Sequence, residues 1–204
     1  MTISERSLTA WSDGGTYSGE EAGIIARCLA GEEPAFVALY DRHAAYVYRL
    51  CFSLLQHRED AEEALQDTFE YAFRKLAKYD PDRASFKTWL YQIAVSRSRN
   101  KRRRKRLPTF PLAWLGGEPV SDEAAPAPEE VMAHDGRQKR IWRALSQLSP
   151  KLRETAVLRY SEGLTYPEIG RILQIPAKTA ESRMRLAHKA LREIMNEESP
   201  QEKK

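Results

Sequence analysis

A polar, mostly basic helix face near the C-terminus carries the residue types that read the edges of DNA bases. Arginine and lysine donate to guanine, and glutamate can accept from cytosine. The face consists of Lys178, Glu181, Ser182, Arg185, Lys189 and Arg192. The opposite side repeats apolar residues at three- and four-residue spacing: Ala180, Met184, Ala187, Leu191 and Ile194. A helix with these two sides fits the major groove of DNA.

The segment just before this helix predicts the element that would position it. Thr165 with Glu168 three residues later is a capping box, so a short helix is expected to begin there. Gly170 is small where two helices should cross, and Ile175-Pro176 predicts the turn that ends the first helix. Alone, the second helix could be an ordinary amphipathic helix with a solvated face. The cap, the small residue, the turn and the basic face together favour a DNA-binding helix-turn-helix.

A second candidate site lies upstream, where aromatic residues precede a basic run. Trp89 and Tyr91 flank the apolar side of a helix expected from about Ser85, which leads into six consecutive basic residues, 101–106. Its non-core side is expected to carry Thr88, Gln92, Ser96 and Arg99. Aromatic rings beside a basic track suit single-stranded nucleic acid, because bases stack and phosphates pair with cations. The alternative is that the rings are packing residues and the basic run is solvated; we favour phosphate contact for the run.

The helix expected between Asp60 and Leu76 has an acidic side formed by Glu63, Gln66, Asp67 and Glu70. Such a side could bind a basic protein groove. From the spacing alone, however, a solvated charged face is the better interpretation.

Charged residues are unevenly distributed along the chain, and the composition changes between its segments. The 204 residues include 33 basic and 29 acidic ones, which gather in separate stretches and so predict one surface for a polyanion and another for a basic partner. The expected fold class is all-α: two small helical domains joined by a flexible linker, the C-terminal one a helix-turn-helix. We expect a disordered tail at 1–19, helical domains at 20–106 and 137–196, a linker at 107–136 and a tail at 197–204. In the first helix Ile24, Ile25, Cys28 and Leu29 are expected to share one face.

Several function classes are disfavoured. Cys28 and Cys51 form no CxxC pair, and the four histidines lack metal-ligand spacing, so no metal and no cofactor is expected. No paired nucleophile and base or glycine-rich phosphate loop supports an enzyme. We find no signal peptide and no apolar stretch long enough to cross a bilayer. The sequence therefore predicts a cytoplasmic, non-enzymatic protein that does not insert into membranes.

Three segments, in order, resemble bacterial RNA polymerase sigma factors of the extracytoplasmic-function (ECF) type. They are DAEEALQDTFEYAF, SFKTWLYQIAVSRSRN and LTYPEIGRILQIPAKTAESRMRLAHKAL. The resemblance implies a protein that binds core RNA polymerase, directs it to promoters and helps melt the −10 element. It also implies contacts with the β′ clamp helices and the β flap of the polymerase, and an anti-sigma factor as a partner.

The resemblance implies three groups of site residues. Polymerase binding falls on Asp60, Glu63, Gln66, Asp67 and Glu70. Contacts to the −10 DNA fall on the loop 79–84 and on Tyr79, Ser85, Lys87, Trp89, Gln92, Ser96, Arg99 and Arg102. Readout of the −35 element falls on Lys178, Thr179, Glu181, Ser182, Arg183, Arg185 and Lys189.

Three residues depart from the family pattern. Many relatives have asparagine at the position of Ser96, a basic residue at Glu181 and arginine at Leu186. The promoter preference therefore cannot be copied from relatives. A stand-alone helix-turn-helix regulator is the alternative function, but such proteins usually need a dimer surface, and the sequence shows no heptad or extra apolar helix for one.

Overall fold

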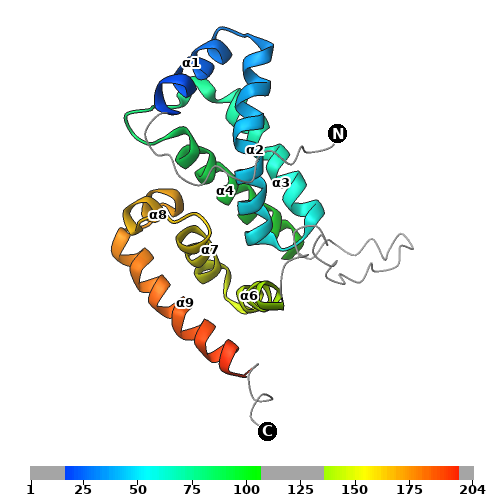
Figure 1. The fold of residues 1–204 in the computed structure, drawn as a ribbon, viewed down its shortest axis with the longest axis vertical. Helices are drawn as coiled ribbons and strands as arrows, with labels where there is room; N and C mark the ends of the chain where they lie inside the picture. Colours follow the sequence, from blue (N-terminus) through cyan, green and yellow to red (C-terminus); the bar gives the residue numbers. More distant parts are fainter. Residues whose placement is uncertain (1–16, 107–135, 198–204) are drawn as a thin grey trace, which may run out of the picture. The chain divides into compact units, whose positions relative to one another are not determined.

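The computed structural model describes residues 17–106 and 136–197, and every regular element in these ranges is a helix (Figure 1). The all-α prediction is therefore confirmed for the described chain. The predicted N-terminal tail up to residue 16, the linker from 107 to 135 and the tail from 198 lie outside these ranges. The chain divides into two compact units, 1–43 and 44–204, with the boundary inside a helix.

The first unit contains α1 (Tyr17–Leu29) and the beginning of α2 (Glu33–Leu55). Gly31 ends α1 with a positive φ of 84°, and its amide donates to the carbonyl of Cys28. Ile25 and Cys28 are buried as expected. Leu29, the last residue of α1, is 55% exposed, so the shared apolar face is not buried along its whole length.

The second unit begins with the rest of α2 and continues with α3 (Arg58–Arg74), a 3-10 turn η2 (Leu76–Lys78) and α4 (Phe86–Arg106). His57 caps α3, because its Nδ1 accepts the amide hydrogen of Asp60 at 3.4 Å. The buried apolar residues recur every three or four positions along each helix. They include Val47, Leu50, Leu54, Ala61, Ala64, Phe69, Ala72, Phe86, Leu90, Ile93 and Ala94.

Four further helices follow among the residues that the structure describes in this unit: α6 (Gly136–Gln147), α7 (Pro150–Tyr160), α8 (Tyr166–Leu173) and α9 (Ala177–Glu197). Arg153 fixes the turn between α6 and α7, since its guanidinium donates to the carbonyls of Leu145 and Leu148. Ala156, Leu158, Ile169 and Met184 are buried. In this unit α8 and α9 follow one another across a short turn, as Figure 1 shows, so the predicted helix-turn-helix is present.

Candidate nucleic-acid interface

The first helix of the helix-turn-helix begins with the predicted capping box. Thr165 is the N-cap of α8, and the Glu168 carboxylate accepts from the Thr165 amide at 2.7 Å and from its hydroxyl at 2.6 Å. These hydrogen bonds, the hydroxyl's first, lower the pKa of Glu168 below its usual value. The charged carboxylate therefore fixes the start of the helix that supports α9.

The turn between α8 and α9 is fixed by two residues with special backbone demands. A Cβ atom on Gly170 would lie 2.7 Å from the carbonyl oxygen of Ile175, so the helices cross too closely for a side chain. Gln174 ends α8 in the left-handed conformation, with φ 57°. The Ile175 amide then donates back to the Gly170 carbonyl at 2.9 Å. This close turn sets the direction in which α9 leaves.

The second helix, α9, has the two sides that the sequence predicts. Ala180, Met184 and Ala187 are buried. The proposed reading residues are exposed or half-buried: Lys178, Glu181, Arg185 and Lys189 are exposed, and Thr179, Ser182 and Arg183 are half-buried. The apolar side packs inward, which leaves the polar side available for DNA.

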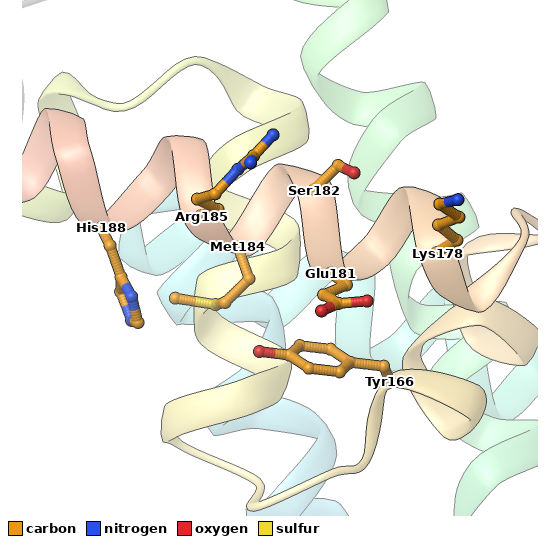
Figure 2. A pocket seen from close by; sticks show the side chains of 7 residues that line it. All are labelled: Tyr166, Lys178, Glu181, Ser182, Met184, Arg185 and His188. Atoms are coloured by element: carbon orange, nitrogen blue, oxygen red, sulfur yellow. The ribbon is translucent and has the colours of Figure 1, made fainter.

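A shallow pocket beside α9 shows how these polar side chains divide (Figure 2). Figure 2 shows Lys178, Ser182 and Arg185 projecting from one side of the helix, while Glu181 and His188 project toward the side where Tyr166 of α8 lies. Glu181 therefore lies apart from the row of Lys178, Ser182 and Arg185. Neither Tyr166 nor His188 was among the predicted site residues, and no local sequence signal distinguished them.

The predicted polymerase-binding side of α3 is only partly open. Glu63, Gln66 and Glu70 are exposed and Asp67 is half-buried. Asp60, in contrast, is 7% exposed and pairs with Lys105 at 2.7 Å and Lys101 at 3.7 Å, both in α4. Lys101 also pairs with Glu63. Asp60 thus joins α3 to the basic end of α4, and the exposed acidic surface is centred on Gln66, Asp67 and Glu70.

An aromatic cluster holds the loop before α4. The ring of Tyr79 lies 5.2 Å from that of Phe86 and 5.5 Å from that of Trp89, centroid to centroid. The Tyr79 hydroxyl donates to the Ala84 carbonyl at 3.1 Å, which closes the loop. Ser85 accepts the Thr88 amide hydrogen at 3.2 Å at the start of α4. These contacts hold the loop in one conformation without nucleic acid.

One residue of α4 lies elsewhere than the sequence predicts, and Tyr91 follows the alternative in which the ring is a packing residue. Thr88 is buried rather than on the polar side, because its hydroxyl is hydrogen-bonded to that of Ser85 at 2.9 Å. Tyr91 is buried too, and its hydroxyl donates to Glu162. Burial, reinforced by the Glu162 charge, raises the pKa of Tyr91 well above its usual value. Trp89 is half-buried and Ser96 is exposed, so both can be reached from solvent.

The basic side of α4 makes contacts that the sequence does not predict. Arg99 and Arg102 both pair with Glu154 of α7, and Lys87 lies 3.6 Å from the carboxylate of Glu162. The amide of Gln92 donates to the Arg171 carbonyl at 3.2 Å. The sequence did not predict Glu154 and Glu162 as functional candidates, because nothing local connects them to partners more than 50 positions away.

Within the described ranges, no helix is long and apolar enough to cross a membrane. The same residues contain no group of three His, Cys, Asp or Glu side chains arranged to hold a metal ion.

Comparisons with known proteins match both parts of the chain. The family described as Sigma-70 region 2 matches residues 39–107, and Sigma-70, region 4 matches residues 138–191. The ECF RNA polymerase sigma factor SigE of Mycolicibacterium smegmatis is 32% identical over 89% of this chain and 71% of its own length. SigK of Mycolicibacterium vanbaalenii is 31% identical over 87% of this chain and 90% of its own length.

Solved structures show the same fold. CnrH, determined in complex with the cytosolic domain of CnrY, has a TM-score of 0.64 at 23% identity; the match covers 88% of this chain and 99% of CnrH. The RpoE sigma factor of Bartonella quintana, determined with the anti-sigma factor NepR, has a TM-score of 0.61 at 21% identity, covering 79% of this chain and 96% of RpoE.

This chain belongs to the ECF family of RNA polymerase sigma factors. It is a transcription initiation factor that binds core RNA polymerase and promoter DNA and directs the polymerase to promoters. The family acts by lending specificity to the polymerase rather than by catalysing a reaction itself. The comparisons do not favour the alternative of a stand-alone helix-turn-helix regulator.

Proposed function

We propose a division of labour among three surfaces of this sigma factor. The acidic surface of α3, centred on Gln66, Asp67 and Glu70, binds the β′ clamp helices of the polymerase. The loop 79–84 with α4 holds the −10 strand, and α9 reads the −35 element. The observation that carries this proposal is the helix-turn-helix geometry: a capped α8 and a close turn present a polar row on α9.

Readout of the −35 element rests on that row. Arg185 is exposed and projects with Lys178 and Ser182 (Figure 2), so it can reach a base edge while Lys189 reaches a phosphate. Thr179 and Arg183 border the row. Glu181 projects toward Tyr166 instead, and we assign it a base-edge or solvent contact at the margin of the site.

Holding of the −10 strand rests on the preformed loop and on α4. Tyr79 and Trp89 provide rings near the loop, and Ser85 starts the helix beside them. Single-stranded bases stack on such rings, while cations track the backbone. We assign phosphate contact to Lys87, Arg99 and Arg102 and base contact to Gln92 and Ser96.

The wider setting follows from the family. We propose domains at 20–106 and 137–196, a β flap contact by the C-terminal domain, and action in the cytoplasm together with the polymerase. The structural neighbour RpoE was solved with an anti-sigma factor, and we extend that class of partner to this chain.

Run-off transcription with core polymerase on a genomic promoter library tests the proposed function. The full chain should produce transcripts from a discrete set of fragments that share two elements at fixed spacing. Core polymerase alone and polymerase with the Arg185→Ala variant are the controls. Transcripts whose start sites share no upstream element would contradict the division of labour.

A further inference from the structure

Glu154 holds two arginines that the proposed function gives to DNA phosphates. Its side chain is 2% exposed and comes from α7. One carboxylate oxygen accepts from Arg99 Nη2 at 2.7 Å; the other accepts from Arg99 Nε at 3.1 Å and from Arg102 Nη2 at 2.9 Å. A planar guanidinium that binds a carboxylate in this two-pronged way binds phosphate in the same way. If Arg99 and Arg102 contact DNA as proposed, the Glu154 carboxylate occupies the place that a phosphate would take.

A second buried carboxylate, Glu162, lies beside the other end of α4, with different partners. Its side chain is 5% exposed, it accepts from the Tyr91 hydroxyl, and it lies near Lys87. Gln92 is hydrogen-bonded to the backbone of Arg171. Lys87, Gln92, Arg99 and Arg102, four of the eight residues that we assign to the −10 strand, are thus already in contact with residues of the segment after position 150.

α4 also packs against α8, and further contacts join the end of α2 to α6 and α7. Gln56 donates to the Trp142 carbonyl at 3.2 Å, Arg153 donates to the Leu54 carbonyl at 3.3 Å, and the rings of Phe52 and Trp142 meet edge to face. A polar contact between parts of one chain resembles a transient interface, which can open.

A pocket beside Glu154 gives phosphates a way in. It is lined by Arg99, Arg102, Lys151 and Arg183 as well as by Glu154, so four cations surround one carboxylate. The excess positive charge attracts a polyanion to the place where the carboxylate sits. One carboxylate does not neutralise four cations. DNA phosphates can therefore compete with Glu154 for Arg99 and Arg102.

We propose that Glu154 and Glu162 form an internal lock, in which α7 and the segment after it cover the phosphate-binding side of α4 until polymerase separates them. This inference rests on the proposed role of α4 in holding the −10 strand. In the free protein the lock lowers the affinity of α4 for single-stranded DNA. In the holoenzyme, where the segments are apart, the two carboxylates no longer compete.

Charge-neutral variants of the full chain test the lock. Glu154→Gln, Glu162→Gln and the double variant are compared with wild type for binding a fluorescent single-stranded oligothymidine, measured by anisotropy. Glu32→Gln is the matched control, because it removes an exposed carboxylate from the ion pair with Arg27 in the first unit. Circular dichroism checks that each variant is folded, and Glu162→Gln decides the question if Glu154→Gln does not fold.

The double variant should bind about tenfold more tightly than wild type if the lock is closed in about nine molecules of ten. Adding Arg99→Ala to Glu154→Gln should remove most of that variant's gain. Unchanged affinity in both single variants, or the same gain in Glu32→Gln, would overturn the lock.

Transcription assays with core polymerase distinguish failure of the lock from failure of the proposed role of α4 in holding the −10 strand. If the variants transcribe like wild type but show no gain in DNA binding, the lock fails and the proposed function stands. In a second outcome, the Glu154 and Glu162 variants bind DNA more tightly, but holoenzymes with Arg99 or Arg102 substituted transcribe normally. The carboxylates then do cover these arginines, but the arginines do not hold the −10 strand.

Discussion

Gly170 and Ile175 approach so closely that a Cβ at position 170 would lie 2.7 Å from the Ile175 carbonyl oxygen. Gly170→Ala should therefore destabilise the chain by about 1–3 kcal/mol, because backbone rather than a flexible side chain must move. Urea unfolding measures the change. The control is Gly23→Ala in α1, where nothing lies within 4 Å and alanine should stabilise the helix. Equal effects at the two positions would contradict the close crossing.

The capping box should make stability depend on pH. The pKa of Glu168 is lowered in the folded chain, so its contribution is fully present above the unfolded value, near 4.5, and is lost as pH falls through the folded value. Wild type should be more stable than Glu168→Gln at neutral pH, and the difference should shrink on acidification within that window. Parallel urea titrations measure it. A difference that stays constant through the acidic range would show that the charge contributes nothing.

The acidic surface of α3 should act through polymerase. Reversing both charges, with Asp67→Lys and Glu70→Lys, should abolish binding to core polymerase and leave the helical content intact, since neither side chain is buried. The matched control is Glu59→Lys with Glu62→Lys, two exposed acidic residues of the same helix. Pull-down with purified core polymerase is the measurement. Wild-type retention of the Asp67/Glu70 variant would exclude this surface.

Arg185 and Lys189 should have separable roles on DNA. Arg185→Ala should cost about 1–3 kcal/mol and relax the preference at one promoter position. Lys189→Ala should weaken all sequences alike and flatten the slope of log affinity against log salt by about one unit. Binding of the full chain with core polymerase to a set of −35 variants gives both quantities. Uniform weakening by Arg185→Ala would make Arg185 a phosphate contact.

The loop before α4 should matter for melting more than for docking. Tyr79→Phe removes the hydrogen bond to Ala84 and keeps the ring, and Trp89→Ala removes a stacking surface worth roughly 1–3 kcal/mol per base. Both variants should lose transcription from duplex promoters and recover part of it on a template with an open −10 bubble. Tyr40→Phe is the control, and circular dichroism accompanies Trp89→Ala. Equal loss on both templates would remove the loop from strand opening.

The helix-turn-helix could be predicted because its signals are local. The capping box, the small residue at 170 and the apolar stripe of α9 depend on neighbours within seven positions. The structure shows the cap and the close crossing, and it buries Ala180, Met184 and Ala187 of the stripe while Leu191 and Ile194 are half-buried. The exposure of Leu29 could not be predicted, because helical spacing fixes a direction around the axis but does not say how much of that face is covered.

The ion pairs of α4 could not be predicted in the same way. Asp60 lies some forty residues from Lys101 and Lys105, and Glu154 more than fifty residues from Arg99 and Arg102. Helical period relates only residues on one helix, so charges on separate helices come together through tertiary packing alone. For this reason the sequence predicts a basic side of α4 and an acidic side of α3 but does not predict which charges neutralise one another.

The left-handed residue Gln174 has a consequence for how this turn can vary among natural variants. Its backbone carries the strain of a side chain at φ 57°, which glycine escapes and asparagine tolerates well. Position 170 is limited by space, so any side chain there forces the backbone to shift, whereas position 174 is limited by handedness. The two positions of this short turn are thus restricted by different physical causes, space at the first and backbone handedness at the second.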